Sequence, residues 1–438
     1  MSQTKCQTFV VAVVIVFIAA FAHAGDIPRI SDLSITTFAP WSKPIEDYRT
    51  FAETCSDGER SLGDIYFKSI HDLAPFEDKM WFGYGDANNN LASAMMGYGY
   101  RGIEFRYFDS PDNPLPHTTL ESGEEHIDHF RILDGVLWAP GLDGNNKDDV
   151  SAQPGIRGNV YRLEDEQWLK FREINGGVHV HDIAIWKKGV FVVGSGTYDL
   201  TEWGEGNIYR YLWKSTTNGK SFNTVRRIVH PVLGGVGDTR WLRLLSLENV
   251  LYIFGYYSIF EEEKIFPTHA RYEGTDVIPF DEENPDELMN IFCRGTEPLP
   301  DGTGLMWGIV DSQDDGPGMK WGSEARKKAG QKALWHLDIN GKPTQLKALD
   351  GKNIIDIYHS PETEELIYLL RTDDEETTPP AYTATILVAS RDNPGKVKEL
   401  LTFTSEVKQI SIAYWKGAMF LGMDDCGVWK GESESTVR

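Results

Sequence analysis

The sequence is short of cysteine, of positive charge and of long apolar runs. Only 4 of its 438 residues are cysteine, which excludes a scaffold held together by many disulfide bonds. Lysine and arginine number 43 against 66 aspartate and glutamate residues, for a formal net charge of −23. Nucleic-acid binding needs a basic surface that releases counterions, so that class of protein is excluded. The charge suits a soluble exported protein, or one that binds cations.

The one long apolar run lies at the N-terminus. Lys5 precedes an apolar stretch at residues 9–22, and the sequence Ala22-His23-Ala24 precedes Gly25. This is the pattern of a secretory signal cleaved after residue 24. We therefore expect residues 1–24 to be removed and the protein to be secreted or periplasmic. No second run of about 18 apolar residues follows, so we expect no membrane span after cleavage. A retained N-terminal anchor is the alternative.

A strand–turn–strand pattern recurs along the rest of the chain. Residues 178–194 show it best, with two apolar strands joined by a Lys-Lys-Gly turn. The first apolar residues of the second strands are spaced 52 to 61 residues apart, and they are Met80, Val136, Val190, Val250, Leu305, Leu366 and Ala418. Units of strands without a helix-length amphipathic run predict an all-β, seven-bladed β-propeller. The alternative is a pair of β-sandwiches, and a misjudged fifth unit would make the ring six- or eight-bladed.

The last unit is incomplete, which predicts how the ring closes. It has strands at residues 410–415, 418–422 and 427–430, and the chain then ends. We expect residues 33–38 to supply the fourth strand and remove the open sheet edge. The predicted organisation is therefore an N-terminal segment at residues 25–61, which carries the ring-closing strand, and the propeller at residues 62–438.

Three cysteines remain after signal cleavage, namely Cys55, Cys293 and Cys426. An odd number cannot all pair within the chain, and the sequence leaves the pairing open. We favour a bridge from Cys55 to Cys426 because the two ends of a propeller meet. Three buried thiols are the alternative.

One hairpin carries a family resemblance. Residues 215–222 read Ser-Thr-Thr-Asn-Gly-Lys-Ser-Phe, and residues 390–396 form a looser copy. The sequence resembles the Asp-box hairpin of sialidase-like propellers, in which this hairpin is a structural feature. The resemblance implies the propeller fold and no activity. The Arg-Ile-Pro motif that introduces the sialidase arginine triad is not matched by residues 27–30, which read Ile-Pro-Arg-Ile.

Histidines gather at the starts of the first three inner strands. Five of the 11 histidines lie there: His71, His126, His129, His179 and His181. Because inner strands line the axis of a propeller, we expect their side chains to share one cavity. His126, His179, His181 and Asp182 are the predicted ligands of a divalent metal, with Zn, Mn and Ca as candidates.

The same cavity suggests catalytic roles. His71, His126 and His181 are the predicted groups for proton transfer, and Arg240 and Arg243 are predicted to face an anionic substrate. The alternative is that inner-strand His and Asp side chains merely hydrogen-bond the neighbouring blade.

The connections between second and third strands are long, acidic and rich in aromatic residues, whereas the turns between inner and second strands are tight. Loops of this kind on a rigid scaffold favour binding, and flat rings suit sugar stacking. The favoured interpretation is an exported monomer that binds a glycan, and the sequence leaves open whether it also cleaves the glycan as a metal-assisted lyase or hydrolase. The alternatives are a non-catalytic protein-interaction scaffold and, ranked last, a quinoprotein-type enzyme.

Overall fold

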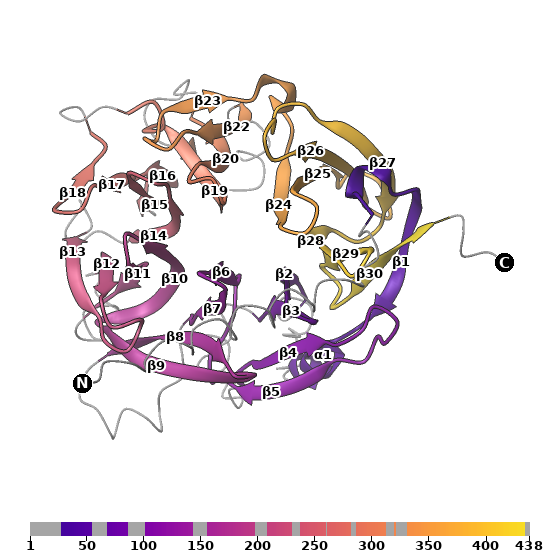
Figure 1. Cartoon of the computed structure of the whole chain (residues 1–438), viewed down its shortest axis with the longest axis horizontal. Helices are drawn as coiled ribbons and strands as arrows, with labels where there is room; N and C mark the ends of the chain where they lie inside the picture. Colours follow the sequence, from indigo (N-terminus) through magenta and orange to yellow (C-terminus); the bar gives the residue numbers. More distant parts are fainter. Residues whose placement is uncertain are drawn as a thin grey trace, which may run out of the picture.

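Seven antiparallel sheets surround a common axis like the blades of a propeller (Figure 1). The computed structural model describes residues 28–54, 68–85, 101–142, 156–197, 208–229, 237–259, 261–281, 286–311, 319–320 and 331–433. Six of the sheets have four strands, and the fourth blade has six. The predicted seven-bladed β-propeller is confirmed, including the fifth blade, whose inner strand contains Gly295 and Pro298.

Each blade runs from an inner strand at the axis to an outer strand at the rim. The innermost strands are β2 (Ile70–Phe76), β6 (Arg131–Leu133), β10 (Gly177–Trp186), β14 (Gly237–Ser246), β19 (Ile291–Pro298), β24 (Ile354–Ser360) and β28 (Gln409–Trp415). The second strands are β3 (Lys79–Tyr84), β7 (Val136–Pro140), β11 (Gly189–Gly196), β15 (Leu251–Ile259), β20 (Gly304–Val310), β25 (Glu365–Asp374) and β29 (Ala418–Met423).

The third strands are β4 (Glu104–Phe108), β8 (Arg157–Glu164), β12 (Tyr209–Ser215), β17 (Ala270–Tyr272), β22 (Lys332–Leu337), β26 (Ala381–Ser390) and β30 (Val428–Ser433). The outer strands are β5 (His117–Glu121), β9 (Gln167–Asn175), β13 (Asn223–Val229), β18 (Val277–Pro279), β23 (Pro343–Gln345), β27 (Lys398–Ser405) and, in the seventh blade, β1 (Ile35–Ser42).

The first strand of the chain closes the ring. β1 pairs antiparallel with β30 and forms the outer edge of the seventh blade, as predicted, although it begins and ends later than residues 33–38 (Figure 1). Phe38 of this strand is buried and stacks on Phe403 of β27, with ring centroids 5.3 Å apart. The closing strand therefore joins the seventh blade to the sixth as well as completing its own sheet.

The tight turns between inner and second strands have the geometry that the right-handed twist of a hairpin demands. Lys187 and Lys188 have φ angles of 44° and 64°, and Asp134 and Gly135 have 50° and 73°. Two successive positive φ angles are typical of type I′ turns, which bring adjacent strands together without splaying them. The predicted Lys-Lys-Gly turn is thus a two-residue hairpin turn.

A β-bulge near the start of the inner strand recurs in six of the blades. The ladder register shifts at His71, His181, Leu242, Arg294, Ile355 and Ile410, and β10 has a second shift at Val178. A bulge re-aims the side chains on either side of it. Four of these bulge residues line the axial cavity, namely His71, Arg294, Ile355 and Ile410. The bulge therefore helps to decide which residues face the axis.

The apolar core lies between the blades. Facing sheets contribute to each cluster; for example, Phe191 of the third blade and Trp241 of the fourth are buried in one cluster. Trp138 and Val192 form another cluster between the second and third blades. Each blade thus covers the faces of its neighbours, which is why the repeat unit requires a ring.

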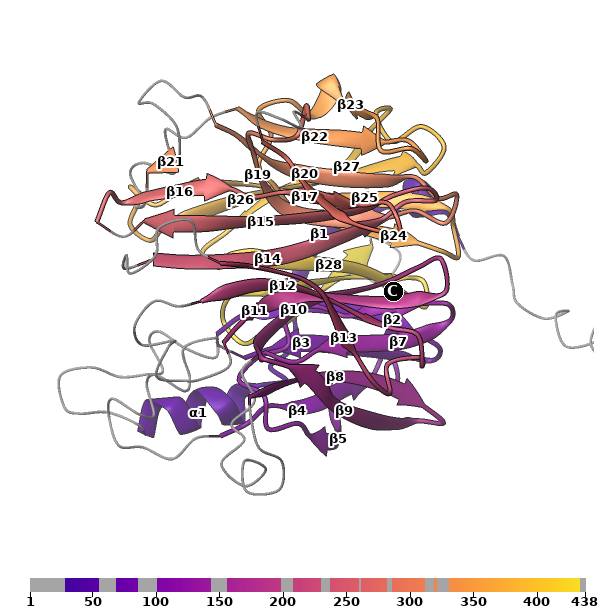
Figure 2. The ribbon, with the colours of Figure 1, turned by 90° about the vertical axis from the view of Figure 1, so that its left-hand side faces the viewer.

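Two features were not predicted. Helix α1 (Glu46–Thr54) follows β1, and the second-to-third connection of the fourth blade is a hairpin in which β16 (Lys264–Pro267) pairs with β15 and with β21 (Met319–Lys320). The prediction of a long loop between the second and third strands is therefore wrong for this blade, because its aromatic and β-branched residues continue the strands. Both features lie on the same face of the ring (Figure 2).

Several predictions fall outside the described residues. They are the signal at residues 1–24, the Cys55 partner of the expected disulfide, and most of the acidic and aromatic loop residues. In the described part of the chain, no helix has the length and apolar character needed to cross a membrane.

Candidate functional site

The inner strands enclose an axial cavity of about 820 Å³. Residues of all seven blades line it, from His71 and Asp128 near the starts of the inner strands to Pro75 and Pro361 at their far ends. Its volume is within the range of about 300–1,000 Å³ that is typical of small-molecule sites. The wall combines apolar residues such as Leu73 and Phe130 with charged residues such as Asp72 and Arg131.

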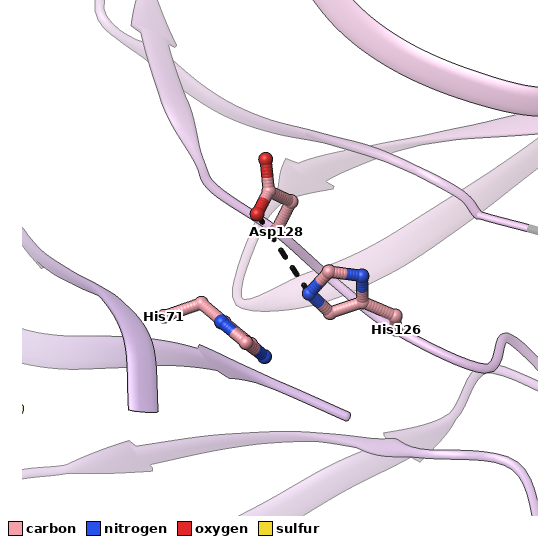
Figure 3. A group of neighbouring side chains, drawn as sticks. All are labelled: His71, His126 and Asp128. Atoms are coloured by element: carbon pink, nitrogen blue, oxygen red, sulfur yellow. Dashed lines mark ion pairs between the residues drawn. The ribbon is translucent and has the colours of Figure 1, made fainter. Parts of the chain in front are cut away.

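His71, His126 and Asp128 form a potential metal centre, and His71 and Asp128 line the cavity. Their ligand atoms all lie within 4.8 Å of one another, and this is the one such group found among the described residues. The two imidazole rings have centroids 4.3 Å apart, and Asp128 lies beside His126 (Figure 3). Nε2 of His126 is 3.8 Å from Oδ1 of Asp128. The set joins the first blade to the second.

Local backbone geometry places these side chains. His71 occupies the bulge of β2, and the His126 backbone bridges Gly85, just after β3, and Leu142. Gly85 has a φ of 117°, and a Cβ atom there would lie 2.7 Å from the His126 Cα. A side chain at Gly85 would therefore displace His126. The close approach of two blades at a glycine brings the two histidines together.

The protonation states suit metal binding. His71 Nε2 donates to the Gly85 carbonyl oxygen at 3.0 Å, which leaves the lone pair of Nδ1 for a ligand. Both ring nitrogens of His126 are buried without a hydrogen-bond partner among the described residues. Burial, and next the neighbouring His71, lower the pKa of His126 to about 3. The imidazole is therefore neutral at physiological pH, which is the form that binds metals.

Asp128 is held as a carboxylate. Burial by itself would raise its pKa, but Arg243, His129 and His126 together hold the pKa well below its usual range. Arg243 Nη2 lies 2.5 Å from Oδ2 of Asp128, and His129 Nδ1 lies 3.4 Å from the same oxygen. Oδ1 is the oxygen that faces His126, so the outer contacts orient the carboxylate and leave one oxygen for a cation.

The predicted metal ligand Asp182 is instead surrounded by protein donors. It is fully buried, and its carboxylate accepts from Arg131, His129 and the backbone N–H groups of Ile183 and Leu244. The Leu244 contact crosses to the fourth blade. Asp356 makes the equivalent bridge from the sixth blade to the Ile412 N–H of the seventh. Asp182 thus hydrogen-bonds the neighbouring blade, which is the alternative role considered for it from the sequence.

The other predicted ligands also lie apart from the His71 group. His179 and His181 have ring centroids 5.7 Å apart, and His179 Nδ1 is 3.4 Å from Ser195 Oγ. Burial, followed by the charge of Arg240, lowers the pKa of His181 well below its usual value. Its Nε2 atom is buried and has no hydrogen-bond partner among the described residues. His181 is therefore a neutral imidazole that does not belong to the group, although the charge of Asp128 acts on its pKa.

The two arginines predicted to face a substrate anion each contact a carboxylate of the protein. Arg240 pairs with Asp238, two residues earlier in β14, and Arg243 pairs with Asp128. The positive charge of each arginine is therefore compensated by an aspartate of the protein itself. The geometry accordingly makes Arg243 a positioning partner of Asp128.

Three further carboxyl groups belong to residues that line the cavity. They are Asp72, Glu297 and Asp356. Burial raises the pKa of each of them, and that of Glu297 rises to about 8. Repulsion from Asp72 adds to the effect of burial on the pKa values of Glu297 and Asp356. This wall is consequently less negative at neutral pH than its composition indicates.

Sequence reasoning missed Asp128 and Arg131. Asp128 lies two residues after His126, and this short spacing could have indicated it. The spacing does not show which aspartate of the first three blades lies beside the histidines. Arg131 forms two hydrogen bonds to Asp182, at 3.0 and 2.9 Å, and contacts Thr296 across the cavity. No pattern in the sequence connects residues 131 and 182.

No protein-family model matches the chain, and neither does any curated protein. Among solved structures, the β-propeller domain of the Trilobed protease from Pyrococcus furiosus is similar with a TM-score of 0.46 and 9% identity, over 84% of this chain and 94% of that one. Virginiamycin B lyase from Staphylococcus aureus has a TM-score of 0.43 and 11% identity, over 83% and 94%. A periplasmic gluconolactonase from Pseudomonas aeruginosa has 0.40 and 13%, over 73% and 85%. Similarity at this level carries no argument about chemistry.

Proposed function

We propose that the chain is an exported, monomeric, metal-dependent enzyme that cleaves an acidic glycan in the axial cavity. The observation that carries the proposal is the His71, His126 and Asp128 group, whose three ligand atoms lie within 4.8 Å of one another and of which His71 and Asp128 line the axial cavity. Two imidazoles and one carboxylate favour Zn²⁺ or Mn²⁺ over Ca²⁺, which prefers oxygen ligands throughout.

A divalent ion in this group would supply a Lewis acid for an oxygen of the substrate. His181 is the candidate base, because its imidazole is neutral and its Nε2 is without a partner among the described residues. In an elimination, it would take the proton beside the uronate carboxylate, a carbon–carbon double bond would form, and the glycosidic C–O bond would break. The leaving oxygen would then take up a proton. In hydrolysis, water would add across the same bond.

Metal content tests the proposal first. The full chain should be expressed with its signal, purified without chelators and examined by elemental analysis. We expect about one equivalent of Zn or Mn, lost in the His71→Ala/His126→Ala double variant. His117→Ala is the matched control, because His117 lies on the rim strand β5 and pairs there with Asp109. Metal retained by the double variant, or calcium alone in the wild type, would contradict the site.

Activity is tested separately on polygalacturonate. Unsaturated ends among the products would indicate elimination, and new reducing ends without unsaturation would indicate hydrolysis. His181→Gln should retain the metal and lose turnover by about 100-fold or more, as expected for removal of a general base. Full turnover in this variant would remove His181 from the mechanism.

A further inference from the structure

One arginine between the third and fourth blades has no acidic partner among the described residues. Arg210 is the second residue of β12, and its Nη1 atom donates to Oγ1 of Thr239 in β14 at 2.9 Å. Its Nε atom is buried without a hydrogen-bond partner, and no carboxylate in the described ranges forms an ion pair with its guanidinium. In a chain with a formal charge of −23, a half-buried arginine would be expected to contact an acid.

The fourth blade holds the Arg210 side chain in place. β12 and β14 pack against each other and lie side by side in Figure 1. The guanidinium carbon of Arg210 lies 5.8 Å from the centroid of the Trp241 ring, and Trp241 follows Thr239 by two residues in the same strand. The Thr239 hydroxyl and the Trp241 ring therefore orient the guanidinium, and neither of them neutralises its charge.

A pair of aromatic rings lies next to Thr239. Thr239 pairs in the ladder with Tyr257 of β15, and Tyr257 pairs with Phe266 of β16. Because directly paired residues point to the same face of a sheet, both rings lie on the face that carries Thr239. The rings stack with centroids 4.6 Å apart, and both are half-buried. An aromatic surface and a guanidinium thus occur together between the two blades.

Arg210 keeps its charge at neutral pH. Burial lowers its pKa to about 10, and Tyr257 is the neighbour that acts in the opposite direction. Asp238 precedes Thr239 but does not compensate Arg210, because its carboxylate contacts Arg240 and the Tyr256 hydroxyl. A buried charge without a partner is costly, so an anion from outside the chain would stabilise this part of the propeller.

We propose that Arg210 binds the carboxylate of an acidic sugar between the third and fourth blades. A guanidinium offers a planar fork that matches a carboxylate, and one cation suits an anion with a single charge. The rings of Tyr257 and Phe266 suit the apolar face of the same sugar. β12, β14 and β2 all begin at the same pole of the ring, so a glycan bound at Arg210 lies at the pole where His71 lies. The identification of the ligand as a sugar rests on the proposed function; the anion site itself does not require the metal.

Calorimetric titration of the full chain with digalacturonate and with its methyl ester tests this inference. The titrations are done in EDTA, so that metal plays no part. We expect the acid to bind and Arg210→Gln to weaken its binding by about tenfold or more, since charge-assisted hydrogen bonds are lost. Arg210→Lys keeps the charge without the planar fork, so its affinity should fall between the two. The ester should bind equally weakly to the wild type and to Arg210→Gln.

Thermal unfolding separates ligand binding from a structural role of Arg210. Because Arg210 forms no ion pair with the described residues, Arg210→Gln in buffer should unfold at a temperature no lower than that of the wild type. Digalacturonate should raise the unfolding temperature of the wild type more than that of the variant. A large drop for the variant in buffer, together with unaltered affinity for the acid, would make Arg210 a structural residue and overturn the site.

Arg391→Gln is the matched control. Arg391 lies in the turn between the third and outer strands of the sixth blade, at the opposite pole, and it contacts Glu364 and Asp392. The change in net charge is the same, so the control should bind digalacturonate as the wild type does. A similar loss of affinity in the control would show that net charge alone decides binding and would overturn the assignment.

The outcomes separate this inference from the proposed function. No binding of the acid, unchanged affinity in Arg210→Gln, or tighter binding of a sulfated disaccharide would each overturn the carboxylate site. If digalacturonate binds through Arg210 and the wild type contains no metal, the carboxylate site stands and the metal-dependent reaction fails. If the wild type contains the metal and cleaves polygalacturonate while Arg210→Gln binds the acid normally, the reaction stands and the Arg210 site fails.

Discussion

Two aspartates at equivalent positions of the propeller differ in their electrostatic environment. Asp182 and Asp356 both follow the bulge of an inner strand and both accept a backbone N–H from the next blade. Arg131 and His129 compensate Asp182, and its pKa is held well below its usual range despite burial. Burial and the nearby Asp72 raise the pKa of Asp356 instead. Asp182 belongs to a buried ion pair, whereas Asp356 favours its neutral form.

Replacement of each by asparagine should separate the two roles. Asp182→Asn leaves Arg131 buried beside a neutral group, so we expect a loss of about 3–5 kcal/mol in the free energy of unfolding. Asp356→Asn removes no paired charge and should cost about 1 kcal/mol. Urea unfolding in EDTA at neutral pH measures both. Equal losses would show that the backbone contacts, rather than the ion pair, dominate.

The histidines show how much of the candidate site the sequence alone predicts. Of the five histidines expected to share one cavity, His71 and His129 line it, and His71 lies together with His126 and Asp128. Their partner is Asp128 rather than Asp182, because the bulge in each strand and the short bridges around Gly85 decide which side chains converge. Whether the group holds a metal stays a prediction.

At the scale of elements, the ring depends on a strand that is distant in sequence from its sheet. β1 contributes Phe38 to the cluster between the sixth and seventh blades, and Trp41 contacts the rings of Phe108 and Phe420. Without β1, the edge of β30 would be open to pairing with other chains. The stability of the closure therefore rests on a few buried side chains of one strand.

Phe38→Ala tests how much that strand contributes. Removal of a buried phenyl ring should lower the free energy of unfolding by about 3 kcal/mol, through lost transfer energy and the cavity left behind. Thr36→Ala on the exposed face of the same strand should stay within about 0.5 kcal/mol of the wild type. Chemical denaturation compares the two. A negligible loss in Phe38→Ala would mean that β1 contributes little to the closed ring.

At the scale of the whole molecule, the axial cavity is less acidic than the chain. Glu297 faces Asp72 and Asp182, which raise its pKa, and Arg131, which lowers it, and burial outweighs them all. Its pKa rises from 4.5 in the unfolded chain to about 8 in the folded protein. The folded state therefore retains a proton that the unfolded state has already lost, and folding is opposed increasingly as pH rises through this window.

Glu297→Gln should remove this pH dependence. The variant cannot ionise, so its stability should equal that of the wild type near pH 4.5 and exceed it above about pH 8, by on the order of 1 kcal/mol because water in the cavity screens the carboxylate. Unfolding curves at both pH values check this, with Glu121→Gln on the exposed rim strand as control. A difference that does not vary with pH would indicate a packing effect.

The sequence by itself determined the repeat, the all-β class, the number of blades and the closure by an N-terminal strand. These follow from the period-2 hydrophobic pattern and the unit spacing, which are properties of consecutive residues. Tertiary structure alone decided which charged groups meet, as with Asp128 and Arg243 or Arg131 and Asp182. The physical reason is that such contacts join side chains 50 or more residues apart, and a one-residue bulge changes which of them faces the axis.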